Sequence, residues 1–285
     1  MQIEFLGTGG ATVIPRPGCT CRVCAQARVE GVPYSRTGPS VFLHGIDVLI
    51  DTPAESALQL ARARVEHVRA AFYTHWHPDH TMGRRVWEMN IDWRRWPPQP
   101  QTTDVYVPAP VAEDFRRRLG IWEHLTYLAE ELGLIRLTEL RDGEAVAIDG
   151  ATVRPIRLAQ GHAYAFLVET ASKRVLIAMD ELRGWMPPEA VQGVDVAVVP
   201  MGVAEFDLLS GERRMAADHI ILALKATFEE TLDVVRALAA GRVVMHHIEE
   251  FNGLSYDDLL EVERQLAEEG MDVTFAYDTL QIDVS

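Results

Sequence analysis

The sequence predicts an α/β fold in which two β-sheets pack face to face and helices cover their outer sides. Three observations lead to this prediction. Many short apolar segments of strand length come first, helical segments intervene, and the same pattern recurs in the second half of the chain. Elements in this order bury their apolar faces by packing in layers. We therefore expect an αββα sandwich.

The first half of the chain contains apolar runs separated by turn residues and helical segments. A turn around Gly45 joins two of these runs. The expected strands are residues 2–8, 41–43, 47–51, 70–74 and 105–107, and the expected helices are residues 55–65 and 112–119. The strand at 70–74 leads directly into a cluster of histidines.

The second half carries stronger local signals. Asp149-Gly150 predicts a hairpin turn, and Thr227 and Ser255 each begin a capping-box pattern at the start of a helix. The expected strands are residues 144–148, 152–158, 163–170, 174–178, 195–199, 242–245, 272–277 and 279–284. The expected helices are residues 227–239 and 255–268.

The length of 285 residues fits one large domain, residues 1–285, with a cysteine-rich loop at 18–24. Two stretches, near 84–101 and 208–218, are interpreted as insertions. Trp87, Trp93 and Trp96 of the first could cap a pocket, join two copies in a homodimer, or pack in the core.

Charge and hydropathy restrict the partners. The chain has 27 Lys and Arg against 42 Asp and Glu, a formal net charge of −15, which repels a long polyphosphate. A small-molecule substrate is therefore expected. No apolar run approaches the roughly 20 residues that cross a membrane, and no signal peptide is evident, so a cytoplasmic location is expected.

His75, His77, Asp79 and His80 fall within six residues directly after a predicted strand. Alternate side chains of an extended segment point the same way, so His75 and His77 can reach one metal ion together. After the turn at Pro78, Asp79 and His80 can face a second ion. The alternative is a chance cluster of surface histidines, which three histidines and one aspartate within six residues at a strand end argue against.

The remaining ligands must come from elsewhere in the chain. His162, Asp180, His246 and His247 all stand at the ends of predicted strands, where ligands converge in α/β folds. The residues alone leave the choice among these four open.

Cys19, Cys21 and Cys24 lie within six residues. An odd, tightly clustered set does not form a disulfide framework, and clustered thiols in a reducing compartment more often bind metal.

The order His-x-His-x-Asp-His, a later His, a later Asp and a final His resembles the metallo-β-lactamase superfamily. Leu6-Gly7-Thr8-Gly9-Gly10 resembles its first strand and turn, and Leu49-Ile50-Asp51-Thr52 resembles the element whose aspartate supports the metal loop. Pro53 stands where the family usually has glycine. The resemblance covers essentially the whole chain and implies the metallo-β-lactamase fold.

The N-terminal segment narrows the resemblance. Gly7-Thr8-Gly9-Gly10, Pro15, the Cys-x-Cys-x-x-Cys element and Arg36-Thr37-Gly38-Pro39-Ser40 together resemble the phosphoribosyl 1,2-cyclic phosphate phosphodiesterases.

This resemblance implies two divalent metal ions, Mn or Zn, with Fe also suited to the ligands. The implied ligands are His75, His77 and His162 for one ion, Asp79, His80 and His247 for the other, and Asp180 as a bridge. His247 is chosen over His246 because the family's last ligand precedes an apolar residue.

The resemblance also implies an additional structural zinc held by the three cysteines. The family's fourth ligand is a histidine at the position of Glu250, so Glu250 is expected to replace it. Glu249, His246 or His44 could substitute instead, and the cysteines could also bind no metal.

The implied activity is hydrolysis of a small phosphodiester, a cyclic ribose phosphate among the candidates, by a metal-bridging hydroxide. Asp180 and His219 are the candidate catalytic residues, His219 as an acid. Arg213 or Arg214 could hold a second anionic group, although surface charge explains each as well.

Other functions stay open from the sequence alone. The fold also serves hydrolases of other esters and thioesters and tRNA 3′-processing nucleases, and a pyrroloquinoline-quinone-pathway-like protein shares a similar cysteine element. A binding protein without activity would be expected to lack ligands, whereas all seven positions are filled.

Overall fold

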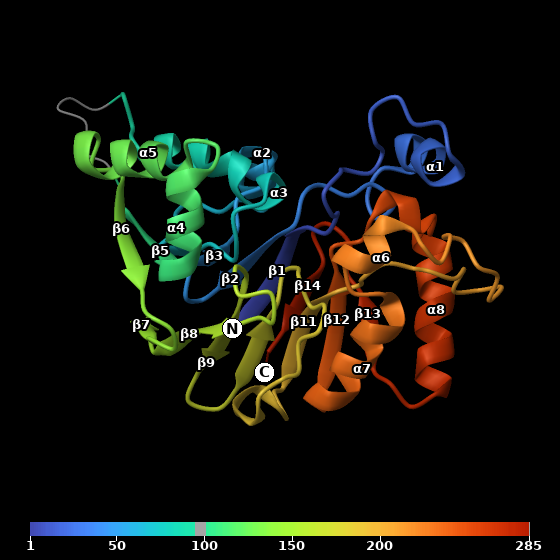
Figure 1. Ribbon diagram of the computed structural model, residues 1–285. Coiled ribbons are helices and arrows are strands. Elements are labelled where there is room, and N and C mark those ends of the chain that lie inside the picture. Colours follow the sequence, from blue (N-terminus) through green and yellow to red (C-terminus); the bar gives the residue numbers. More distant parts are fainter. Residues whose placement is uncertain (95–100, 285) are drawn as a thin grey trace.

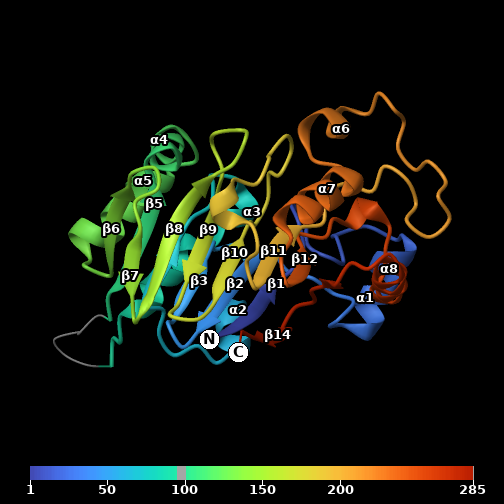
Figure 2. The same cartoon turned by 90° about the horizontal axis from the view of Figure 1, so that it is seen from below.

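The computed structural model describes residues 1–94 and 101–284, and in it two seven-stranded sheets pack together with helices on their outer sides (Figures 1 and 2). The predicted αββα sandwich is confirmed. Residues 95–100, which include Trp96 of the expected insertion, lie outside the described residues.

The first sheet is built mainly from the first half of the chain. Its order is β14 (Gln281–Asp283), β1 (Gln2–Gly7), β2 (Ser40–His44), β3 (Val48–Ile50), β4 (Ala70–Phe72), β5 (Thr103–Pro108) and β6 (Ile135–Leu140). Strands β3 to β6 are parallel to one another, and the other pairs are antiparallel.

The second sheet repeats this plan. Its order is β13 (Val273–Phe275), β12 (Arg242–His246), β11 (Val196–Pro200), β10 (Arg174–Ile177), β9 (Tyr164–Glu169), β8 (Ala151–Arg157) and β7 (Val146–Ile148). Strands β10 to β13 are parallel, and the hairpin predicted at Asp149-Gly150 joins β7 to β8.

Successive side chains of a strand point to opposite faces of its sheet, so the apolar residues of one strand are divided between the core that lies between the sheets and the core under the helices. In β10, Val175 and Ile177 belong to the core between the sheets, whereas Leu176 packs beneath the outer helices. Each fully buried aliphatic side chain of this size stabilises the fold by about 1.5–3 kcal/mol. The inner core therefore fastens the two sheets to each other, and the two outer cores fasten the helices to the sheets.

Helices cover both outer faces. Those on the first sheet are α2 (Ser56–Arg62), α3 (Pro78–Thr81), η1 (Met82–Asn90), α4 (Ala109–Arg117), α5 (Ile121–Thr126) and η2 (Tyr127–Glu131). Those on the second are α6 (Ile220–Leu224), α7 (Phe228–Leu238) and α8 (Tyr256–Glu268), with η3 (Glu189–Val191), η4 (Glu250–Asn252) and α1 (Arg22–Glu30) at its ends. Within the described ranges, no helix is both long and apolar enough to cross a membrane.

The capping boxes predicted for α7 and α8 are present. The side chains of Thr227 and Ser255 accept from the backbone of Glu230 and Asp258, whose carboxylates accept in return from the two cap residues. By contrast, α1, α5, α6 and β6 were not predicted. Strand β6 lies at a sheet edge and exposes half of its residues, so its apolar alternation is weak.

The carboxyl ends of the parallel strands carry the residues of interest. Asp51 follows β3 and the histidine run follows β4, whereas Asp180 follows β10 and His247 follows β12. A hydrogen bond from Ile248 N to Thr8 O (2.9 Å) joins the loop after β12 to the end of β1. The fold therefore brings loops of both sheets to one place.

Candidate metal centre

The histidine run forms the floor of the site between β4 and α3. Pro78 lies in the first turn of α3, where its missing N–H costs nothing and its fixed φ favours the helix. His75 and His80 are fully buried, whereas His77 is partly exposed. The short helix thus returns Asp79 and His80 toward the side chains that precede it.

One group of ligand-type atoms comprises His75, His77, Asp180 and Glu181, which lie within 4.8 Å of one another. His75 Nε2 is 2.8 Å from His77 Nδ1 and 3.9 Å from Asp180 Oδ2. His77 Nδ1 is 3.4 Å from Glu181 Oε1.

A second group comprises Asp79, His80 and His247, again within 4.8 Å. Asp79 Oδ2 is 3.3 Å from His80 Nε2 and 3.4 Å from His247 Nε2. His247 Nε2 is also 3.6 Å from Asp180 Oδ2. The same Asp180 oxygen therefore stands between the two groups.

The ring nitrogens of the second group fit a metal ion. His80 Nε2 and His247 Nε2 are buried, and within the described part of the chain neither has a partner in hydrogen-bond geometry, despite the nearby Asp79 oxygen. A buried polar atom left unsatisfied costs about 1–3 kcal/mol, so such atoms normally have a partner. Imidazoles combined with carboxylates suit Zn, Mn and Fe, which satisfies both nitrogens.

Asp51 fixes the orientation of His80 from behind. Its Oδ1 accepts from Thr74 N (2.8 Å) and its Oδ2 accepts from Thr74 Oγ1 (2.6 Å). The same Oδ2 lies 2.7 Å from His80 Nδ1, which leaves His80 Nε2 directed at Asp79. Asp51 adopts a φ of 61°, so the chain accepts an uncommon backbone conformation in order to place this carboxylate.

The electrostatics favour the metal-binding forms of the histidines of the first group and of both aspartates. Burial and the neighbouring His80 lower the pKa of His75 well below its usual range, and burial lowers the pKa of His77 to about 4. Burial alone would raise the pKa of Asp79 and Asp180, but the adjacent imidazoles of His80 and His247 lower both. Neutral imidazoles and ionised carboxylates are the forms that bind metal. In the second group, despite burial, Asp79 raises the pKa of His80 to about 10 and Asp180 raises the pKa of His247, so these two imidazoles must lose a proton when an ion binds.

His162 lies beside the first group without entering it. Its ring centre is 6.4 Å from that of His75 and 6.0 Å from that of His77, and its Nδ1 is 3.3 Å from Gln160 O. The buried carboxylate of Glu181 is closer to His77. The role of His162 as a ligand therefore stays a prediction, with Glu181 as its competitor.

Glu181 and Lys225 were not anticipated from the sequence. Lys225 Nζ donates to Asp180 Oδ2 (2.5 Å) and to Glu181 Oε1 (2.6 Å). Burial alone would lower the pKa of Lys225, but these two carboxylates raise it above its usual range. The only feature of the sequence that could have indicated Glu181 is its position directly after Asp180 at a strand end. No feature of the sequence indicated Lys225.

Three further candidates lie in other surroundings. His219 is exposed at the start of α6, where its Nδ1 accepts from Ile221 N (3.2 Å), and its catalytic role stays a prediction. Arg213 and Arg214 pair with Glu205 and Asp207 in their own loop. These pairings favour the interpretation of both arginines as surface charge.

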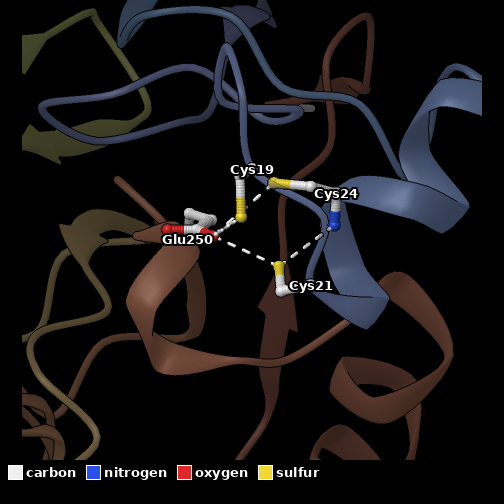
Figure 3. Close-up of side chains that lie close together, drawn as sticks. All are labelled: Cys19, Cys21, Cys24 and Glu250. Atoms are coloured by element: carbon white, nitrogen blue, oxygen red, sulfur yellow. Dashed lines mark hydrogen bonds between the residues drawn. The ribbon is translucent and has the colours of Figure 1, made fainter.

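The three cysteines and Glu250 converge at a separate place, between the start of α1 and η4 (Figure 3). Cys19 Sγ is 2.8 Å from Glu250 Oε1, Cys21 Sγ is 3.2 Å and Cys24 Sγ is 3.6 Å. Thiolates and carboxylates are both ligand types that zinc binds, and these four residues have their ligand-type atoms within 4.8 Å of one another. Glu250 therefore stands where a fourth ligand is needed.

The three side chains that could have replaced Glu250 have partners elsewhere. His44 Nε2 lies 2.6 Å from Glu4, and the buried His246 Nε2 lies 3.2 Å from Ala178 O. Glu249 Oε1 accepts from Ala11 N (3.0 Å), and a side chain at Gly10 would collide with the Glu249 carboxylate.

Comparisons with known proteins identify the family and the fold. A family model described as the beta-lactamase superfamily domain matches residues 45–248. An octanoyltransferase of Porphyromonas gingivalis is 29% identical over 165 residues, which are 56% of this chain and 31% of that protein, so the chain spans about a third of its length.

Two solved structures share the fold over nearly their whole lengths. A diphosphatase from the PhnP family superposes with a TM-score of 0.68 at 20% identity and covers 99% of this chain and 97% of its own. Zinc-bound PqqB from Methylobacterium extorquens superposes with a TM-score of 0.71 at 17% identity and covers all of both chains. At these identities the likeness establishes the fold.

Proposed function

Because the chain belongs to the metallo-β-lactamase superfamily, we propose that it is a metal-dependent hydrolase that cleaves a small phosphodiester. The observation that carries this proposal is the position of Asp180, whose Oδ2 stands within 4 Å of a ring nitrogen in each of the two ligand groups. A carboxylate in this position is suited to bridge two ions.

In this proposal one ion is held at each group, and the first ion also draws on His162, which lies beside its group. His75, His77 and His162 hold one ion, Asp79, His80 and His247 hold the other, and Asp180 is shared. Two such ions would supply a water that is acidic enough to attack near neutral pH and positive charge for the phosphoryl oxygens.

The protein's own residues prepare this site. Asp51 orients His80, and Asp79 and Asp180 are held ionised by the histidines beside them. Lys225 adds a cation at the edge of an otherwise acidic cluster. Burial of these groups keeps water away from their interactions and strengthens them.

Two features favour a small phosphodiester over thioester and lactam substrates. The cysteine cluster with Glu250 accompanies the metal centre, and a protein of the same fold is described as a diphosphatase. A tRNA substrate calls for an exposed basic surface, whereas Arg213 and Arg214 are paired with acidic residues and the net charge is −15.

The test is turnover of bis(p-nitrophenyl) phosphate by metal-stripped protein to which Mn, Zn or no metal is returned. We expect nitrophenolate release that depends on added metal. Protein that holds two ions at this centre and yet releases none would contradict the phosphodiesterase proposal and favour ester, thioester or cofactor-pathway chemistry.

Asp51→Asn is expected to weaken metal binding by about 10–100-fold, since carboxylates that orient a ligating histidine contribute on that order. The physical reason is the loss of the charged partner of His80 Nδ1. Metal affinity is measured by competition with a chelator. Asp149→Asn is the control, because Asp149 lies in the hairpin between β7 and β8 and pairs with Arg69 on the surface. Equal affinity in both variants would contradict the assigned role of Asp51.

A further inference from the structure

A hollow of about 550 Å³, counting the part that opens to solvent, adjoins the candidate metal centre. Asp180 and His247 are among its lining residues, so a molecule in the hollow would lie beside the proposed bridging residue and a proposed ligand. The part that water-sized molecules can enter measures about 120 Å³, below the roughly 300–1,000 Å³ of whole small-molecule sites, so the hollow has room for one group of a substrate. Its chemistry therefore bears on which substrate the centre can receive.

One wall of the hollow is apolar. Leu182, Val203 and Ala226 are buried, whereas Ile221 of α6 is partly exposed and Phe251 of η4 is exposed. Apolar surface of this kind gains free energy by leaving water when it contacts an apolar partner. It offers no donor or acceptor to a hydroxyl group.

Apart from His247, whose Nε2 is assigned to a metal ion, the charged residues that line the hollow contact one another or the backbone. Lys225 donates to both Asp180 and Glu181, and Glu249 accepts from Ala11 N. A polyhydroxylated group placed here would give up its hydrogen bonds to water and find few in return, which is costly. An apolar group would meet no such cost.

We propose that this hollow binds an aryl or alkyl group of the substrate, next to the bond that is hydrolysed. The inference rests on the proposed phosphodiesterase function and makes its substrate class more specific: a phosphodiester with an apolar ester group, in preference to a sugar phosphate. Ile221 is then a specificity-determining residue, because it is the residue of α6 that lines the hollow.

The test measures equilibrium binding, by titration calorimetry, of phosphonates that the enzyme cannot hydrolyse. The metal-loaded protein is titrated with methyl-, ethyl- and butylphosphonate and with 3,4-dihydroxybutylphosphonate. We expect affinity to rise by about fourfold for each methylene that enters the hollow, and butylphosphonate to bind more tightly than its dihydroxy analogue.

A matched pair of variants locates the effect. Ile221→Ala is expected to weaken butylphosphonate binding by about fivefold while leaving methylphosphonate unchanged. Ile220→Ala removes the same atoms from the preceding residue of α6, which is 67% exposed, and is expected to change neither affinity. Both variants alter a short, largely exposed helix.

Equal binding of butylphosphonate and its dihydroxy analogue, no binding of butylphosphonate, or an equal effect of the two variants would overturn the proposal. These outcomes are independent of turnover. If bis(p-nitrophenyl) phosphate is not cleaved but the affinity still rises with chain length, the phosphodiesterase function fails and the apolar subsite stands. If cleavage depends on metal but affinity does not rise with the length of the alkyl chain, only the proposed apolar subsite is overturned.

Discussion

Asp180→Ala is expected to reduce metal-dependent turnover of bis(p-nitrophenyl) phosphate by at least about 100-fold while the protein stays folded. Loss of a carboxylate that only orients a ligand costs up to about 100-fold, and Asp180 stands among the ligand atoms themselves. Its Oδ2 is 3.9 Å from His75 Nε2 and 3.6 Å from His247 Nε2, so its removal affects both ligand groups at once. Initial rates at saturating metal measure the effect.

Three controls make this result specific. Asp180→Asn keeps the shape of the side chain but removes its charge, and we expect it to be nearly as inactive as Asp180→Ala. Asp149→Asn makes the same chemical change in an exposed hairpin and is expected to retain full activity. Circular dichroism and thermal melts establish that each variant is folded. Retained turnover in folded Asp180→Ala would contradict its assignment as the bridging ligand.

The parts of the site that the sequence predicts are those determined by local spacing. His75, His77, Asp79 and His80 lie within six residues after a strand, and the backbone alone brings them together. Asp180 and His247 were candidates because each follows a strand and because ligands gather at the carboxyl ends of parallel strands, but only the resemblance to a family assigned Asp180 as the bridge and chose His247 over His246. The αββα sandwich was predicted for a related reason, since its strands and helices alternate in recognisable periods.

The parts that the sequence did not predict depend on contacts between distant residues. Lys225 reaches Asp180 across 45 positions of sequence, through a loop and the short helix α6 that carried no clear periodicity. Glu181 was overlooked because a second acid beside a proposed ligand is commonplace, and its burial is visible only in three dimensions.

The cysteine cluster was predictable in part from local spacing and in part depends on a contact between distant residues. Its three thiols were evident from spacing, but Glu250 lies more than 220 positions away, and only the resemblance to a family indicated it. The structure places the Glu250 carboxylate among the three sulfurs (Figure 3). The residue that the resemblance indicated therefore lies beside the cysteines that the spacing indicated.

Cys21→Ala is expected to lower the melting temperature by roughly 5–10 °C and to leave turnover per folded molecule nearly unchanged. A metal ion that binds only the native state at about 100 times its dissociation constant stabilises that state by about 2.7 kcal/mol, and each kcal/mol is worth about 2–4 °C in a protein of this size. The site joins the segment before α1 to η4, apart from the two ligand groups of the candidate centre. Its loss should therefore affect stability more than catalysis.

Metal content distinguishes loss of a bound metal ion from simple loss of a helix cap. Cys21 also caps α1 by accepting from Cys24 N, and loss of a cap alone costs about 0.5–2 kcal/mol. Cys21→Ser retains a capping oxygen but removes the thiolate, so it should melt close to Cys21→Ala if metal is responsible. Thr20→Ala, an exposed neighbour, should match the unmodified protein. Elemental analysis should find one metal ion fewer per chain in both Cys21 variants, and an unchanged count would contradict a metal site at the cysteines.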